Sequence, residues 1–393
     1  MSGATVRVEV PDDSLFGPEN MPYGVFAPPG GQFRVGVRLG ESVLDLSRLL
    51  DDPAFARADL NSFLAQGPNS WRVVREKLRE LAESPLPTEA VHALDSIRTA
   101  LPVGIGDYVD FYASIDHATN LGRLFRPDAE PLLPNWRHLP VGYHGRAGTV
   151  VVSGAPVTRP HGQRRTNSPA PEFGPSQRLD IEAELGFVVG TASRRGEPVT
   201  VDEFADHVFG VALVNDWSAR DIQAWEYQPL GPFLGKSFAT SISAWITPLA
   251  ALTQARVPLP PQEPEPLPYL RGTDDHGLDI ALTVTWNGET VSRPPYSHMY
   301  WSPAQMLAHL TANGASIRPG DLYASGTISG PEPDQRGSFI ELSWGGNEPI
   351  TVGETIRTFL LDGDEVTITA TAPGTAGRPI GLGAVGGTVL AAH

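Results

Sequence analysis

The chain has 393 residues, 40% of them hydrophobic and 19% charged, with a formal net charge of −16. This composition is typical of a globular protein and excludes a largely disordered chain. The sequence contains no cysteine, which excludes disulfides, thiol nucleophiles and thiolate zinc sites. The negative charge argues against nucleic acid or an anionic membrane as a partner.

The sequence also gives no sign of insertion into a membrane. No apolar run approaches the roughly 20 residues that a membrane-spanning helix requires. The N-terminus lacks the charged start and apolar stretch of a signal peptide. We therefore expect a cytoplasmic protein.

The first 100 residues contain predicted strands followed by predicted helices. Short β-type runs separated by glycine and proline predict strands at residues 5–10, 32–39 and 42–46. Apolar residues at helical spacing then predict helices at residues 70–83 and 88–98. Because the residues with catalytic chemistry follow directly, we predict a domain boundary near residue 100.

The remainder of the chain is predicted to be mainly β. Strands are expected at residues 149–152, 179–189, 208–214, 280–286 and 339–342, and a proline-rich exposed loop at 257–268. Gly381, Gly383 and Gly386 match a dinucleotide-binding pattern, but too little chain follows for the helix and strand that the motif requires. A glycine-rich β turn is the better interpretation.

The stretch LDIEAELGFVVG at residues 179–190 carries three carboxylates. In a strand, Asp180, Glu182 and Glu184 would share one face. Such a face is most often solvated, but the apolar residues that follow favour a buried strand. Buried carboxylates need a cation, and oxygen ligands without cysteine suit calcium or magnesium.

A second group of polar residues follows an apolar strand at residues 211–214. Asn215 and Asp216 are good helix N-cap residues and predict a helix that starts there. Arg220, Gln223 and Tyr227 would then share one stripe with Asp216. A plain exposed helix face would look the same. Lys236 favours a functional site, because one of only two lysines in the chain stands in a loop rich in glycine, proline and phenylalanine.

The third group lies at residues 107–126. Asp110, Tyr112, His117 and Arg126 offer a metal ligand, a hydrogen-bond donor, a titratable base and an anion-binding group within one short segment. Histidine is the usual general base near neutral pH. From this segment alone, a structural histidine is equally compatible.

Together these stretches resemble the fumarylacetoacetase family along the whole chain. The similarity is carried by DFYASIDHATNLGRLFRP, LPVGYHGRAGTVVVSG, LDIEAELGF, VNDWSARDIQAWEYQPLGPFLGKSF, SGTISGPEP and IELSWGG. The resemblance implies a mainly β fold, with a small SH3-like barrel and two helices over residues 1–100. A larger β-roll catalytic domain over residues 101–393 would follow, and the chain would form a homodimer.

The resemblance also implies an activity and roles for individual residues. The reaction would be metal-dependent hydrolysis of a carbon–carbon bond in 4-fumarylacetoacetate, giving fumarate and acetoacetate at the end of tyrosine and phenylalanine degradation. A catalytic calcium ion would bind Asp110, Glu182, Glu184 and Asp216, and a second, structural magnesium ion would lie near Asp216, Lys236 and Thr240. His117 would be the base, oriented by Glu341, and the oxyanion would be stabilised by Arg220, Gln223 and Lys236. The substrate would be held by Tyr112, Arg126, Tyr143, Gln223, Tyr227 and Thr327.

Two alternatives remain open from the sequence. A related acylpyruvate hydrolase, or an oxo-acid decarboxylase or isomerase, would use the same metal ligands. It would not need Arg126 and Tyr227 in their present context. A non-catalytic calcium-binding structural protein would explain the carboxylates, but not the neighbouring His117, Arg220 and Lys236.

Overall fold

The computed structural model describes residues 4–393 and is built mainly from two β-sheets. The larger sheet has 13 strands. Across its main path the strands are β6 (Val91–Ala93), β4 (Ser42–Asp45), β3 (Arg34–Leu39), β2 (Tyr23–Ala27), β19 (Trp245–Pro248), β16 (Val208–Asp216), β15 (Ala183–Val189), β24 (Leu322–Ala324), β8 (Tyr108–Phe111) and β9 (Gly142–His144). Beside this path, β7 (Arg98–Ala100) pairs with β2, and β18 (Thr240–Ile242) joins β16 to β10 (Val150–Val152).

The second sheet has five strands and packs on the first through a shared core. Its order is β11 (Val157–Thr158), β28 (Pro379–Leu390), β27 (Glu365–Pro373), β22 (Ala281–Trp286) and β23 (Glu289–Ser292). Leu185 on β15, Leu213 on β16 and Val385 on β28 belong to one buried cluster. The predicted glycine-rich turn is therefore part of a strand, since Gly381, Gly383 and Gly386 all lie in β28.

Short strand pairs and helices complete the fold. The pairs are β1 (Thr5–Val6) with β5 (Leu86–Pro87), β12 (His161–Arg164) with β13 (Glu172–Pro175), β14 (Leu179–Asp180) with β17 (Ser218–Ala219), β20 (Arg256–Val257) with β21 (Gly277–Leu278), and β25 (Ile350–Val352) with β26 (Thr355–Arg357). The α-helices are α1 (Leu46–Leu49), α2 (Asn61–Leu64), α3 (Pro68–Ala82), α4 (Ile115–Phe125), α5 (Phe204–His207), α6 (Arg220–Glu226), α7 (Pro303–Thr311) and α8 (Phe339–Leu342). Within the described chain, no helix is both long and apolar enough to span a bilayer.

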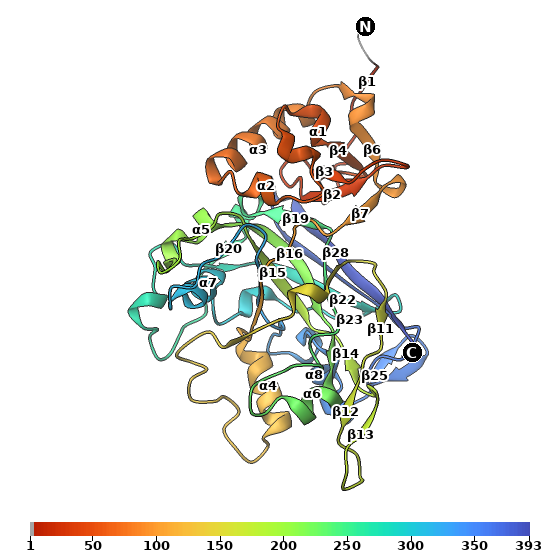
Figure 1. The fold of residues 1–393 in the computed structure, drawn as a ribbon, viewed down its shortest axis with the longest axis vertical. Helices are drawn as coiled ribbons and strands as arrows, with labels where there is room; N and C mark the ends of the chain where they lie inside the picture. The colour runs from red at the N-terminus through yellow and green to blue at the C-terminus, as the bar shows by residue number, and fades with distance from the viewer. Residues whose placement is uncertain (1–3) are drawn as a thin grey trace.

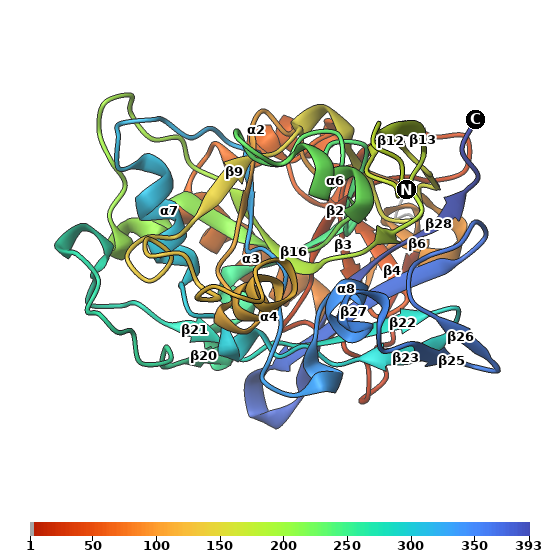
Figure 2. The same cartoon turned by 90° about the horizontal axis from the view of Figure 1, so that it is seen from below.

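An N-terminal unit containing α1–α3 and β2–β4 sits on one end of the larger unit (Figure 1). Hydrogen-bonded pairing of β2 with β19 makes the large sheet continuous between the two units. The other end of the molecule carries α4, α6 and α8 (Figure 1), and Figure 2 shows α4 beside α8. The mainly β architecture with a small N-terminal unit is confirmed. The SH3-like description and the boundary near residue 100 stay predictions.

The predicted helix over residues 70–83 is confirmed as α3, but the helix predicted over residues 88–98 is wrong. This segment instead forms β6 and β7, with short 3₁₀ turns around β6. Val91 pairs with Leu44 of β4, and Arg98 pairs with Ala27 of β2. The backbone groups of those two strands need partners, and this tertiary pairing overrides the local helical pattern.

Two elements predicted next to the polar residues are also wrong, and a third is interrupted. The helix expected from Asn215 begins only at Arg220, because β16 extends to Asp216 by pairing with β18. The strand expected over residues 339–342 is the short helix α8. The strand expected over residues 179–189 is interrupted between β14 and β15. The other strands predicted after residue 100 are present with small shifts in their ends.

We predict that contact between α3 and the end of β15 restricts residue 190 to glycine. A Cβ atom on Gly190 would lie 2.3 Å from Cζ2 of Trp71 on α3. Gly190→Ala should therefore destabilise the protein by roughly 1–3 kcal/mol through overpacking. Urea unfolding measures this change. Gly148→Ala is the control, since its Cβ meets nothing within 4 Å. Equal unfolding midpoints for the two variants would contradict the prediction.

Candidate active site

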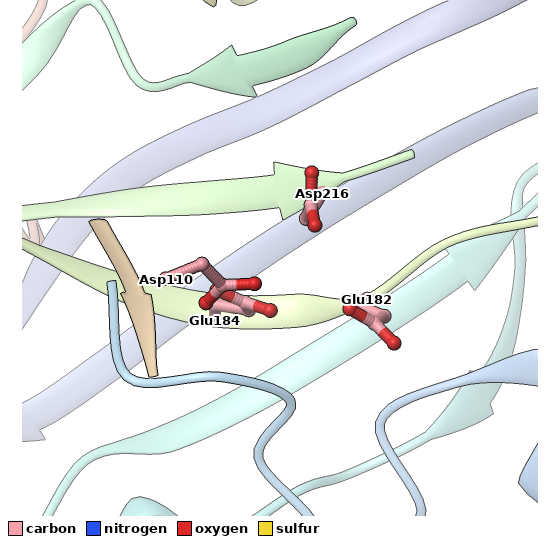
Figure 3. A group of neighbouring side chains, drawn as sticks. All are labelled: Asp110, Glu182, Glu184 and Asp216. Carbon is pink, nitrogen blue, oxygen red and sulfur yellow. The ribbon is translucent and has the colours of Figure 1, made fainter. Parts of the chain in front are cut away.

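Four carboxylates converge on the part of the large sheet formed by β16, β15, β24 and β8 (Figure 3). Asp110 comes from β8, Glu184 from β15 and Asp216 from the last residue of β16, while Glu182 lies just before β15. One oxygen from each carboxylate lies within 4.8 Å of the others. These are the four residues predicted from the sequence to bind a metal, and the sheet brings them together.

The environment of these carboxylates suits a cation. All four are buried, and both oxygens of Glu184 and Oδ1 of Asp110 have no hydrogen-bond partner among the described residues. Burial and the neighbouring Asp216 raise the pKa of Asp110 well above its usual value. Burial and the Asp110 charge do the same to the pKa of Glu184. Oxygen donors of this kind match a hard divalent ion, so the residues present fit a metal.

Lys236 lies against one side of the carboxylate group. Its ammonium group contacts Glu182 and Asp216 and donates a 2.9 Å hydrogen bond to the Ser218 hydroxyl. Burial would lower the pKa of Lys236, but the two carboxylates outweigh it and raise the pKa. Burial likewise opposes a charged Glu182, and the Lys236 and Arg220 charges overcome this and lower its pKa. The lysine is therefore held in its charged form.

Arg220 begins α6 and bridges two acidic side chains. Its Nε donates a 2.8 Å hydrogen bond to Asp180, and its Nη2 lies 2.8 Å from Oε1 of Glu182. Its Nη1 donates a 3.2 Å hydrogen bond to the side-chain oxygen of Gln223, one turn along α6. The guanidinium thus contacts the carboxylate group, and the amide contacts the guanidinium. The sequence pattern predicted one helical stripe that contains Asp216, Arg220 and Gln223. In the structure Asp216 ends β16, and only Arg220 and Gln223 lie on α6.

His117 and Glu341 form a buried pair at the edge of the carboxylate group. Nδ1 of His117 lies 2.7 Å from Oε2 of Glu341, and its Nε2 lies 4.0 Å from Oε1 of Glu182. Burial opposes the charge of Glu341, and the histidine lowers its pKa against that effect. A carboxylate at Nδ1 fixes the proton on that nitrogen and leaves Nε2 free to accept another.

Neighbouring side chains hold this pair in place. Glu341 accepts hydrogen bonds from Ser329 at 3.0 Å, Ser338 at 2.7 Å and Asn120 at 3.0 Å. His117 itself stands in the first turn of α4, where its backbone N–H donates to the Ser114 hydroxyl at 3.2 Å. The sequence pattern gave no signal for these polar neighbours, because Ser114 and Asn120 belong to α4 and its N-cap, whereas Ser329 and Ser338 lie far away in the sequence.

Tyr143 and Thr240 both donate to Asp216. The Tyr143 hydroxyl lies 3.0 Å from Oδ2 and the Thr240 hydroxyl 2.9 Å from Oδ1. Burial, and next to it the Asp110 charge, raise the pKa of Tyr143 well above its usual value, so the phenol keeps its proton. Asp216, Lys236 and Thr240, which were predicted to lie near a second ion, are thus adjacent in the structure.

The other residues predicted to hold the substrate differ in their burial and in their contacts. The Tyr112 ring meets the His117 ring edge-on at 5.2 Å, and Thr327 is buried with its hydroxyl unpaired among the described residues. Tyr227 caps the end of α6 and is 36% exposed. Arg126 caps α4 and donates a 2.8 Å hydrogen bond to the Pro131 carbonyl. Among the described residues, neither Arg126 nor Tyr227 is hydrogen-bonded to the carboxylate group.

Two family models cover the chain. Residues 19–102 match the model described as Fumarylacetoacetase N-terminal, and residues 108–390 match Fumarylacetoacetate (FAA) hydrolase C-terminal. The fumarylacetoacetase of Rattus norvegicus is 48% identical over 413 residues, with 98% of each chain covered. The human fumarylacetoacetase is 46% identical over the same length and coverage. That of Arabidopsis thaliana is 42% identical over 411 residues, covering 98% of this chain and 97% of the relative.

Solved structures share the fold at low sequence identity. A fumarylacetoacetate hydrolase from Exiguobacterium antarcticum superposes with a TM-score of 0.58 at 18% identity, covering 94% of this chain and 99% of the other. A maleylpyruvate hydrolase from Sphingobium, bound to manganese and pyruvate, gives 0.56 at 16% identity, covering 95% and 100%. With both models matched and full-length identity to curated relatives, the resemblance seen in the sequence is confirmed: the chain belongs to the fumarylacetoacetate hydrolase family.

Proposed function

We propose that this chain hydrolyses 4-fumarylacetoacetate to fumarate and acetoacetate in a reaction that depends on a divalent metal ion. Full-length similarity to curated fumarylacetoacetases supports the substrate. The observation that carries the mechanism is the His117–Glu341 pair, which ends 4.0 Å from a carboxylate of the candidate metal cluster. A non-catalytic calcium-binding protein would need the cluster but would have no use for a base held in this way.

His117 would act as the general base. With its Nδ1 proton directed at Glu341, the free Nε2 can take a proton from a water molecule. The resulting hydroxide attacks a carbonyl carbon of the substrate, and the pair of electrons of that double bond moves to oxygen. When the tetrahedral centre collapses, the carbon–carbon bond breaks, and the departing carbon receives the proton from His117.

The positive and polar side chains around the cluster would stabilise the developing oxyanion. Lys236 is held charged and Arg220 is fixed on two carboxylates, so both are oriented before substrate arrives. Gln223 is oriented by Arg220. A fixed donor to an oxyanion commonly contributes about 3–4 kcal/mol. In the same proposal, Tyr112, Arg126, Tyr143, Tyr227 and Thr327 hold the substrate.

The cluster of Asp110, Glu182, Glu184 and Asp216 would hold calcium, and a second ion, magnesium, would lie near Asp216, Lys236 and Thr240. The bound catalytic ion would supply Lewis-acid polarisation of the carbonyl. Unpaired oxygens on Glu184 and Asp110 support a cation there, and the all-oxygen donor set favours calcium or magnesium. A homodimer and a cytoplasmic location are kept as predictions.

The direct test is incubation of the purified protein with fumarylacetoacetate, with identification of both products. We expect fumarate and acetoacetate in equal amounts, and loss of turnover after exhaustive chelation that divalent ions restore. Release of carbon dioxide, or an isomer of the same mass, would indicate the related decarboxylase or isomerase instead. Full activity in demonstrably metal-free protein would contradict the proposed metal dependence.

We predict that His117→Ala abolishes hydrolysis while folding and metal binding are retained. Removal of a general base commonly lowers the rate by roughly 10²–10⁴-fold. Glu341→Gln should lower it less, because the amide fills the same space but stabilises the imidazolium poorly. Turnover is compared at saturating metal, with circular dichroism as a check on folding. Retention of more than about a tenth of the parent rate in the alanine variant would exclude His117 as the base.

We also predict that metal binding releases protons and weakens as the pH falls. In the metal-free protein, the pKa values of Asp110 and Glu184 are raised, so these carboxyls retain protons to higher pH. A metal ion binds the deprotonated carboxylates and must displace those protons. Calorimetric titration of metal-free protein with calcium in buffers of different ionisation heat measures proton release. Affinity that stays constant as the pH is lowered towards acid would show this prediction to be wrong.

A further inference from the structure

Asp180 is a fully buried carboxylate outside the four-carboxylate cluster. Its two oxygens accept four hydrogen bonds, three from backbone N–H groups and one from Arg220. Its Oδ1 accepts the backbone N–H groups of Ile181 and Phe339, both at 2.7 Å. Its Oδ2 accepts the backbone N–H of Ile340 at 3.0 Å and Nε of Arg220 at 2.8 Å. One side chain therefore joins α8 to α6.

The bonds to Phe339 and Ile340 determine the local structure that carries Glu341. They occupy the first two free N–H groups of α8, which have no partner within the helix. A negative charge at a helix N-terminus is favourable. Glu341 is the third residue of this four-residue helix, and its carboxylate contacts Nδ1 of His117. A shift of α8 would therefore move the group that orients the base.

The hydrogen bond from Arg220 to Asp180 fixes the position of the proposed oxyanion donors. Arg220 is held between Asp180 and Glu182, and this orients the guanidinium group that contacts Gln223. The four groups that contact the oxygens of Asp180 are all N–H donors. Only an ionised carboxylate can accept from all four donors at once.

We propose that Asp180 is a positioning residue that sets the base and the oxyanion donors relative to each other, by capping the helix of Glu341 and anchoring Arg220. This inference rests on the proposed function, because it assigns Asp180 a part in that reaction. Asp180 does not contact the reacting atoms in this proposal. It acts through Glu341 and Arg220.

The test replaces Asp180 by Asn, which keeps the shape of the side chain but removes the charge and turns one acceptor into a donor. The Phe339 ring stacks on Trp286 at 4.2 Å, so α8 keeps an apolar anchor in this variant. We expect kcat for fumarylacetoacetate to fall at least about tenfold, as for loss of hydrogen bonds to a charged group. KM should change less than about threefold, and calcium affinity should remain, since no proposed ligand is altered.

Asp45→Asn is the matched control. Asp45 is equally buried, pairs with Arg34 at 2.6 Å and caps α1 through the Ser47 N–H at 3.1 Å, but it lies in the N-terminal unit. Its replacement should cost comparable stability and leave kcat unchanged. Asp180→Ala is the second variant, because alanine removes the bonds to both α8 and Arg220. It too should lose kcat.

A double-mutant cycle with Glu341→Gln separates positioning from general destabilisation. If Asp180 acts through Glu341, Asp180→Asn should cost much less in the Glu341→Gln background than in the parent, since coupled residues are not additive. Independent losses that multiply would overturn the proposal. So would parent-like kcat in either folded Asp180 variant, or failure of both to fold while Asp45→Asn folds. Lack of turnover by the parent protein would instead reject the proposed function.

Discussion

The burial of four carboxylates beside one another is the constraint on which the rest of the site depends. The carboxylates belong to Asp110, Glu182, Glu184 and Asp216. All four side chains are buried, and one oxygen of each lies within 4.8 Å of the others, so their mutual repulsion must be offset. Lys236 and Arg220 offset part of it from one side, whereas Glu184 has no partner among the described residues. A cation would complete the balance. The same ion would also add the local positive charge that a dicarboxylate needs in a chain of net charge −16.

The interruption between β14 and β15 gives this cluster its geometry. A continuous strand would place Asp180, Glu182 and Glu184 on one face as equivalent side chains. Because the strand breaks, Glu182 pairs its backbone with Ser338 and lies near His117 as well as Lys236, while Asp180 turns to α8 and Arg220. One short stretch thereby contacts the carboxylate cluster, the proposed base and the proposed oxyanion donors. Small displacements in it would affect all three.

Charge and hydrogen bonding together keep the proposed base in one orientation. Glu341 accepts from three neutral donors besides His117, so its carboxylate cannot rotate without losing several bonds. A fully satisfied buried network of this kind is rigid, and a partly satisfied one is costly. The hydrogen-bonding capacity of the carboxylate cluster, by contrast, is only partly satisfied. Its oxygens that lack a partner among the described residues are costly in the absence of a cation and would become ligands if one binds.

The sequence by itself determined the family, the mainly β composition and the identity of the four carboxylates, because long motifs and alternating strands are local properties. Through the family resemblance it also predicted roles for His117, Glu341, Arg220 and Lys236, which the structure places beside the carboxylates. The predictions from the sequence were wrong where pairing between distant segments determines the secondary structure. Residues 88–98 follow a helical pattern but supply strands to β4 and β2, and β16 continues past the expected helix start at Asn215 because β18 pairs with it. Residues 339–342 form a helix because Asp180, 159 residues away from Phe339 in the chain, caps their N–H groups. Only the tertiary structure brings such distant donors and acceptors together, and buried backbone groups must find partners wherever the fold provides them.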